Sequence, residues 1–408
     1  MKKLQVLRKE KRGRTAEARE GMSLREHHEE VLRSSPVSPS TVESLRYLVT
    51  WHTDRQNLIV ARKYLAQLAS FCRDDARVWL SFCVVCALAG EIEESHRSLV
   101  EVVRLTEKPE EDVLIKYCQG LLYECRGKLS EALDMYYCGI EMSDVQHDSE
   151  QLLHEEAAAL GDFDTENAAF KRMTLLKDAK IEFLIRVASV KKDRGELHEA
   201  VIVADLAARN SNMASPGLIA NLACVRGSIF SAQQQILQAE MSYREALLAV
   251  PGHSVALERL GAVYLRYREC VPTAVGCFAE AIESNPLSYT SWYMIGRAYM
   301  AAGRYDDALE AYHRALSIEP NVAEIWCSLG ILYFSQAQRV EAQGAFRRAL
   351  RLDPRLAEVW YNLGVLCESQ GQAREAHQCF IKSRQFGLGE RLISAGVELV
   401  DSRTLTAL

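Results

Sequence analysis

The sequence predicts an all-α fold, a right-handed superhelix of stacked antiparallel helix pairs. One observation that carries this prediction is a repeat period of about 34 residues in the C-terminal half. The other is a content of only nine prolines and 22 glycines in 408 residues, which disfavours an all-β protein rich in tight turns. A stack of repeats escapes the usual domain size of about 150 residues, because each repeat packs only on its neighbours.

The repeat is clearest from Trp292 onward, where eight positions of one unit recur one period later. They are Trp292, Ile295, Gly296, Tyr299, Ala308, Tyr312, Ala315 and Pro320, followed by Trp326, Leu329, Gly330, Tyr333, Ala342, Phe346, Ala349 and Pro354. A third unit keeps Trp360, Leu363, Gly364, Ala376 and Phe380 and loses the proline. This pattern resembles the tetratricopeptide repeat (TPR), a helix–turn–helix unit of about 34 residues.

Each residue type in the pattern has a physical reason. Small residues at Gly296 and Ala308 are expected where the two antiparallel helices approach closely. Trp292 and Tyr299 share one apolar stripe of the first helix, because their spacing follows the helical period. Pro320 lies just past the second helix, where no helical N–H is needed. We therefore predict that the aromatic residues pack between repeats.

The pattern weakens towards the N-terminus, and the ends of the chain differ from it. The predicted segments are a basic tail with a Ser-Pro linker (1–40), degenerate TPR-like helical repeats (41–213), regular TPR repeats (214–388), and a capping helix with a tail (389–408). Residues 141–180 are helical in composition but do not follow the repeat spacing. No long, uninterrupted apolar run occurs, so no membrane span is expected.

Charge bears on the partners. Residues 1–14 hold seven Lys or Arg side chains and one Glu, which fits a nuclear-localisation or nucleic-acid patch and fits a solvated tail equally well. The whole chain carries a net charge of −6. Direct nucleic-acid binding by the repeats is therefore not expected, and proteins are the predicted partners.

No catalytic or cofactor-binding motif is present: no Walker loop, no G-x-G-x-x-G, no H-E-x-x-H and no G-x-S-x-G. Cys83 and Cys86 form a C-x-x-C with no second ligand pair at zinc spacing, so we expect them to be buried on a helix face. The two histidines and two glutamates at 27–30 are interpreted as a solvated helix face. Scattered cysteines fit a reducing, intracellular compartment. We expect a non-enzymatic protein without cofactor or metal.

The candidate binding surface follows from the repeat. In stacked TPR units the first helices line a concave groove. Residues of those helices that leave the packing stripe are the candidate protein-binding residues, namely Glu258, Arg266, Tyr293, Arg297, Met300, Cys327, Ile331, Phe334, Tyr361, Val365 and Glu368. This mixture suits an amphipathic helix or an extended segment with apolar anchors. TPR co-chaperones hold a C-terminal carboxylate with Lys and Asn at groove positions, and those residues are missing here, so capture of a chaperone tail is disfavoured.

The last repeats resemble a narrower family. The strings WYMIGRAYM (292–300), EIWCSLGILYF (324–334), RALRLDP (348–354) and EVWYNLGVLCES (358–369) are similar to the TPR array of the fungal general transcriptional co-repressor. They are equally similar to the TPR region of the related animal histone H3 lysine-27 demethylases. The resemblance covers roughly 253–400 and implies a nuclear scaffold with a WD-repeat partner and chromatin-associated regulators. These 408 residues contain no jumonji-type domain, so no demethylase chemistry is carried over.

Two functions therefore stay open. The first is a TPR scaffold for transcription regulation in a nuclear co-regulator assembly. The second is a TPR adaptor of a cytoplasmic complex in trafficking, ciliary or ubiquitin-ligase machinery. A redox role for Cys83 and Cys86 is a remote third hypothesis, since buried structural cysteines are inert.

Overall fold

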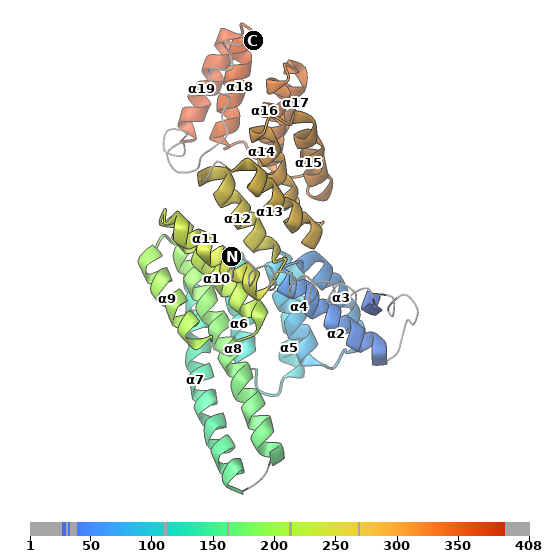
Figure 1. Ribbon diagram of the computed structural model, residues 1–408, viewed down its shortest axis with the longest axis vertical. Coiled ribbons are helices and arrows are strands. Elements are labelled where there is room, and N and C mark those ends of the chain that lie inside the picture. The colour runs from blue at the N-terminus through green and yellow to red at the C-terminus, as the bar shows by residue number, and fades with distance from the viewer. Residues whose placement is uncertain are drawn as a thin grey trace, which may run out of the picture. The chain divides into compact units, whose positions relative to one another are not determined.

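The structure is a computed structural model that describes residues 27–29, 32, 39–109, 112–160, 163–211, 214–267 and 270–387. Over these residues the chain is built of α-helices, α2 to α19, and contains no strand (Figure 1). The predicted all-α solenoid of helix pairs is thus confirmed. The basic cluster at 1–14 and the predicted capping helix after 388 lie outside the described residues.

The chain divides into two compact units, residues 1–256 and 257–408, called here the N-terminal unit and the C-terminal unit. The division lies in the first turn of α12. The change from degenerate to regular repeats predicted at 213–214 is a change in sequence regularity, and the packing continues across it, since α10 contacts both α8 and α9.

From residue 39 onward, the described part of the N-terminal unit contains five helix pairs. They are α2 (Pro39–Asp54) with α3 (Leu58–Phe71), α4 (Ala76–Leu88) with α5 (Ile92–Leu105), α6 (Val113–Cys125) with α7 (Leu129–Leu160), α8 (Phe163–Asp193) with α9 (Leu197–Asn210), and α10 (Pro216–Ala232) with α11 (Ile236–Ala249). The helices of each pair pack on each other.

The C-terminal unit contains the regular repeats. Its pairs are α12 (Ser254–Tyr267) with α13 (Val271–Ser284), α14 (Tyr289–Ala301) with α15 (Tyr305–Ile318), α16 (Ala323–Ser335) with α17 (Arg339–Leu352), and α18 (Ala357–Ser369) with α19 (Ala373–Gln385). Helices α12 to α19 lie within this unit, apart from the first turn of α12, which belongs to the N-terminal unit.

Close approach of the two helices of a pair depends on glycine. A methyl group added at Gly330 in α16 would lie 2.5 Å from the ring of Phe346 in α17, and that ring is fully buried. The same relation recurs in other pairs, namely Gly120 with Tyr136, Gly227 with Tyr243, Gly261 with Phe278, Gly296 with Tyr312, and Gly364 with Phe380. The predicted close approach at Gly296 is confirmed, and its partner is the aromatic ring of the second helix.

The repeat tryptophans have a polar role that the sequence did not reveal. Each indole N–H donates a hydrogen bond to the carbonyl oxygen of the proline six residues earlier: Trp292 to Pro286 (3.0 Å), Trp326 to Pro320 (3.0 Å) and Trp360 to Pro354 (2.9 Å). The bond fastens the turn between repeats to the next first helix. These indoles are therefore half-buried or near the surface rather than enclosed in the core.

Helices α7 and α8 explain why residues 141–180 do not follow the repeat. They are 32 and 31 residues long, more than twice the 14 residues of helices such as α15 and α17. The first part of α7 and the last part of α8 belong to the solenoid. The remaining parts of the two helices form an antiparallel hairpin that extends beyond the other helices of the N-terminal unit (Figure 1). We call this hairpin, residues 141–160 and 163–180, the arm.

The helices of the N-terminal unit form a closed circuit, in which the second helix α3 links α2 to α4. Contacts join α4 to α6, α6 to α8, α8 to α10, and finally α10 to α2. At this last junction, the seam, Gln56 Nε2 donates to Asn221 Oδ1 (2.9 Å) and His253 Nε2 lies 3.2 Å from the same oxygen. Ser254 Oγ donates to the carbonyl oxygen of Arg55 (3.0 Å). Segments from opposite ends of the unit's sequence are thus in direct contact.

The seam also fixes the state of His253. The backbone N–H of Ala256 donates to His253 Nδ1 (3.2 Å), so Nδ1 is an acceptor and the ring proton is on Nε2, facing Asn221. Burial lowers the pKa of His253 to about 4. The imidazole is therefore neutral over the physiological pH range.

The histidines at 27 and 28 differ in environment. His27 is exposed, as interpreted from the sequence, whereas His28 is half-buried. The Nδ1 of His28 lies 3.0 Å from Ser44 Oγ, and its ring centroid is 4.4 Å from that of Tyr47. The interpretation as a solvated face is wrong for His28, because α2 supplies a partner that sequence spacing could not indicate.

We predict that Gly330→Ala destabilises the protein. A gain of about 1 kcal/mol in helix propensity is outweighed by overpacking against Phe346, which costs about 1–3 kcal/mol. Gly344→Ala in α17 is the matched control, because its added methyl meets no atom within 4 Å, and we expect it to stabilise. Urea denaturation measures both. Equal effects of the two substitutions would show that the glycine–ring approach is not limiting.

We predict that acid weakens the seam. As pH falls from 6.5 to 4, the unfolded chain binds a proton at residue 253 that the folded state excludes, so stability present above pH 6.5 is lost, by about 3 kcal/mol. His253→Gln lacks this titration. The difference in unfolding free energy between wild type and variant should therefore shrink towards pH 4, and a difference that is constant with pH would contradict the prediction.

Candidate functional site

The candidate binding residues lie on the four first helices of the C-terminal unit, α12, α14, α16 and α18. The structure divides them into a buried and an accessible set. Cys327, Ile331, Phe334 and Val365 are buried, and they pack together between α16 and α18. These four side chains hold neighbouring repeats together and present little accessible surface in this structure.

A signal for this burial is present in the sequence. Helix α16 reads AEIWCSLGILYFS and is apolar on every side after its first turn. A helix that is hydrophobic all round is a buried helix, because it has no polar face to present to water. The stripe model used for the prediction assumed one packing face per first helix, whereas α16 also packs against the first helices before and after it.

The accessible set keeps the chemistry that was predicted. Arg266 and Glu368 are exposed, and the other members, Glu258, Tyr293, Arg297, Met300 and Tyr361, are half-buried. The guanidinium of Arg297 lies 5.9 Å from the centre of the Tyr293 ring. Tyr and Arg are the residue types most enriched at the energetic centres of protein interfaces. Their role as a binding surface stays a prediction.

Polar contacts link successive first helices. Tyr293 Oη in α14 lies 3.2 Å from Ser328 Oγ in α16, and Asn362 Nδ2 in α18 donates to Cys327 Sγ (3.6 Å). The members of each pair are separated by one more position than the repeat period. Sequence reasoning missed Ser328 and Asn362, although each is a polar residue inside an apolar helix, which is the signal that could have found them.

Glu258 is a structural anchor. Its carboxylate accepts hydrogen bonds from the hydroxyls of Ser288 (2.8 Å) and Thr290 (2.9 Å), and also from that of Ser291. Ser288 caps the N-terminus of α14, where a negative charge is favoured by the helix dipole. Glu258 therefore ties α12 to the start of α14 through its Oε1 atom.

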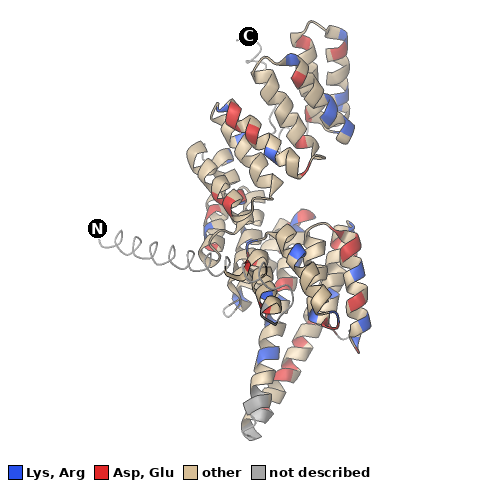
Figure 2. Ribbon diagram, turned by 90° about the vertical axis from the view of Figure 1, so that its right-hand side faces the viewer, with Lys and Arg blue, Asp and Glu red and all other residues tan. Residues whose placement is uncertain are grey.

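Charge is mixed over both units. Figure 2 shows Lys and Arg interspersed with Asp and Glu along the ribbons, with no continuous basic stripe on the part of the chain that is coloured. Among the described residues, no group of three or more His, Cys, Asp or Glu side chains is placed to hold a metal ion. None of the described helices is long and apolar enough to cross a bilayer.

The C-x-x-C is buried, as expected from the sequence. Cys83 and Cys86 are both fully buried in α4. Burial and the neighbouring Glu94 carboxylate raise the pKa of Cys86 to about 12. A thiol with such a pKa stays protonated at neutral pH, and the thiolate is the reactive form. The Cys83 sulfur instead lies 3.3 Å from Ser95 Oγ, across the α4–α5 pair.

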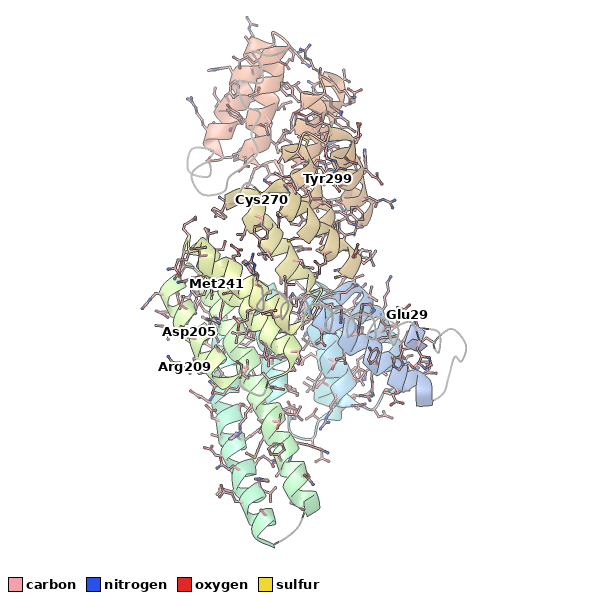
Figure 3. All side chains as sticks on the ribbon, in the orientation of Figure 1. Glu29, Asp205, Arg209, Met241, Cys270 and Tyr299 are labelled. Atoms are coloured by element: carbon pink, nitrogen blue, oxygen red, sulfur yellow. The ribbon has the colours of Figure 1, made fainter. Side chains whose placement is uncertain are left out.

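The N-terminal unit contains a groove that sequence reasoning did not find. A cavity of about 780 Å³ lies between α9 and α11, with α10 as its floor. Val201, Phe230, Met241 and Leu248 supply apolar lining, and the Arg226 guanidinium lies between the carboxylates of Asp205 (3.8 Å) and Glu245 (3.6 Å). Figure 3 labels Asp205 and Met241 on this flank of the unit.

A charged cluster joins α6, α7 and α8 inside the same unit. Tyr136 Oη donates to Glu124 (2.7 Å), and the Arg186 guanidinium lies 3.7 Å from the same carboxylate. Arg186 Nε also donates to Tyr117 Oη (3.3 Å). Burial raises the pKa of Glu182, one turn before Arg186, to about 7. The groups of this cluster bond to one another across three helices, which gives it a structural role.

We predict that Cys86 is inert in the folded protein. At pH 8 its alkylation by iodoacetamide should be at least a hundredfold slower than in the unfolded chain, because the site is buried and its pKa is raised. The exposed Cys125 is the internal control and should be modified first in the native state. Mass spectrometry of labelled peptides measures both. Rapid native labelling of Cys86 would revive the redox hypothesis.

Comparisons with known proteins agree with this architecture. Residues 146–397, more than half of the chain, match the family of the cilia and flagella-associated protein 70 C-terminal domain. A TPR repeat-containing protein of Schizosaccharomyces pombe is 39% identical over 59 residues, which are 14% of this chain and 7% of that protein. The match thus spans less than a tenth of that relative's length.

Solved structures share the fold at low sequence identity. The crystal structure of the APC/C hetero-tetramer Cut9–Hcn1 superposes with a TM-score of 0.55 and 17% identity over 78% of this chain and 54% of that chain. A tetratricopeptide repeat protein of Parabacteroides merdae has a TM-score of 0.44 and 18% identity over 61% of this chain and 96% of that chain. The helix pairs of the repeat and the family match over more than half of the residues make the chain a TPR protein, and it belongs to the family of the cilia and flagella-associated protein 70 C-terminal domain.

Proposed function

We propose that this chain is a non-enzymatic TPR scaffold that holds protein partners in a ciliary or flagellar complex. The observation that carries the proposal is the family match over residues 146–397, which includes most of the arm and all described residues of the C-terminal unit. It favours the adaptor hypothesis, in its ciliary form, over the other cytoplasmic complexes. The absence of catalytic motifs in the sequence supports a binding role.

The accessible first-helix surface of the C-terminal unit is the proposed binding site. Tyr293, Arg297 and Met300 lie on consecutive turns of α14, and Tyr361 and Glu368 lie two turns apart on α18. Half-buried aromatic rings offer apolar area already fixed by packing, so binding costs little side-chain entropy. Arg297 on α14 and Glu368 on α18 supply charges of opposite sign on this surface. The matching partner is a segment with apolar anchors flanked by one acidic and one basic residue.

A nuclear co-regulator assembly is the second candidate. The strings at 324–334 and 358–369 favour it, because they resemble the TPR array of the fungal co-repressor. Both strings lie in repeats whose residues are fixed by packing, such as Gly330 against Phe346. Packing of this kind acts on any regular TPR array, so the strings support this candidate less than the family match supports the first.

We predict localisation to cilia in ciliated cells and loss of a partner when the surface is changed. Arg297→Ala combined with Glu368→Ala should reduce the labelling of at least one ciliary partner tenfold or more. Arg351→Ala on the second helix α17 is the control, since it is exposed and lies off this surface. Proximity labelling with imaging of the tagged protein measures both. Nuclear residence with WD-repeat and chromatin proteins would favour the second candidate instead.

A further inference from the structure

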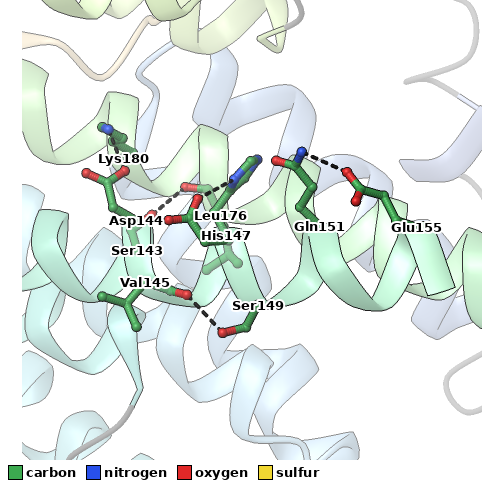
Figure 4. Close-up of polar contacts among 10 residues, drawn as sticks. Ser143, Asp144, Val145, His147, Ser149, Gln151, Glu155, Leu176 and Lys180 are labelled. Carbon is green, nitrogen blue, oxygen red and sulfur yellow. Dashed lines mark hydrogen bonds and ion pairs between the residues drawn. The ribbon is translucent and has the colours of Figure 1, made fainter.

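One face of α7 in the arm has no packing partner among the arm's described residues. There α7 packs against α8: Ser143 Oγ donates to the carbonyl oxygen of Leu176 (2.9 Å) (Figure 4). Arg172 Nε donates to Glu150 (3.0 Å). Lys180 forms a further ion pair with Asp144. These contacts all lie on the side of α7 that faces α8, so the opposite side is a single-helix surface.

That opposite side carries two large aliphatic residues. Val145 is 68% exposed and Leu152 is 64% exposed, and they lie seven residues apart. Seven residues are close to two helical turns, about 10.5 Å, so both side chains are on one face. Aliphatic residues at this spacing line the interface between two helices of a coiled coil, and here no partner helix of the described chain covers them.

The same face is acidic. Helix α7 contains eight Asp or Glu residues and no Lys or Arg in its 32 residues. Asp144 and Glu150 are neutralised from α8, as described above. Glu141, Asp148 and Glu155 are exposed, and within the described chain none of them is paired with a Lys or Arg. Their partners on α7 are limited to His147, whose Nδ1 lies 3.9 Å from Asp148, and Gln151, whose Nε2 donates to Glu155 (3.1 Å) (Figure 4). We call Glu141, Val145, Asp148, Leu152 and Glu155 the outer stripe, and their spacing alternates between four and three residues.

We propose that the outer stripe is a docking site for a basic amphipathic helix of a partner protein. The four-and-three spacing selects a helix, because an extended segment repeats every two residues and cannot follow it. Two aliphatic side chains seven residues apart on the partner meet Val145 and Leu152. Lys or Arg residues three or four positions from them meet the three carboxylates.

The carboxylates of the outer stripe set the charge of the partner. Docking removes water from Glu141, Asp148 and Glu155, and a desolvated carboxylate is costly unless it is paired with a cation. A neutral or acidic helix would supply no cation to these three carboxylates. The outer stripe belongs to the N-terminal unit and the proposed binding surface to the C-terminal unit, so the docking site does not rest on the proposed function.

The test uses the full chain and a fluorescent synthetic probe. The probe is an 18-residue Ala/Lys helix with two leucines seven residues apart and lysines on either side of them, and binding is followed by anisotropy. We expect saturable binding that weakens with salt. Val145→Gln with Leu152→Gln should weaken it at least tenfold. Met241→Gln with Leu248→Gln is the matched control, since these residues of α11 are also seven apart and exposed, and it should change affinity less than twofold.

A second probe separates docking from simple charge attraction. In it serine replaces both leucines, and we expect at least tenfold weaker binding. Equal binding of the two probes, equal effects of the two variant pairs, or no saturable binding would each overturn the proposal.

Two other occupants are distinguishable. In a first variant, Gln replaces the seven basic residues of 1–14. If this variant binds the probe tenfold more tightly, the outer stripe is the binding site of the chain's own tail. Sedimentation equilibrium tests for a dimer. If the wild type is a dimer and Val145→Gln with Leu152→Gln abolishes it, the outer stripe binds a second copy of the chain. Either result overturns the proposal.

Discussion

The contact between a glycine of the first helix and an aromatic ring of the second is the constraint on which the repeats depend. With no side chain at Gly330 or Gly296, the ring of the paired residue lies directly against the helix backbone. This approach fixes the distance between the helices of a pair, and the next repeat packs on the surface that the pair creates. The Trp-to-proline hydrogen bond then sets the turn that leads into the next pair. These two local contacts recur in successive repeats, and together they determine where each helix lies in the solenoid.

The fold could be predicted from the sequence because these constraints are local and periodic. Gly330, Phe346 and Trp326 each recur with the period of the repeat, so the period alone gives the helices and their pairing. The arm could not be predicted in the same way. An extension of α7 and α8 interrupts the period while keeping helical composition, and composition alone does not say that two helices run on together. The contact between Gln56 and Asn221 also has no local signal, because it depends on the accumulated rotation of five pairs.

The binding surface could be predicted only in part. Tyr293, Arg297 and Glu368 are accessible, whereas Phe334 and Val365 are buried. A first helix inside this unit, such as α16, contacts its own second helix, the second helix of the preceding repeat and the first helices of both adjacent repeats. A single helical wheel separates one packing face from the rest, and it cannot distinguish a groove position from a contact between consecutive first helices. Only the placement of α14, α16 and α18 decides that question.

The seam of the N-terminal unit changes how this unit is expected to unfold. An open solenoid frays from its ends, since a terminal repeat has a single neighbour and can separate alone. Here the first pair is held at both sides, by α4 and by the hydrogen bonds to Asn221 and Ser254, so it cannot leave without breaking two junctions. Cooperativity in this unit therefore comes from closure of the circuit rather than from regularity of its sequence. This accounts for how degenerate repeats can form a compact unit without the consensus residues that stabilise the regular ones.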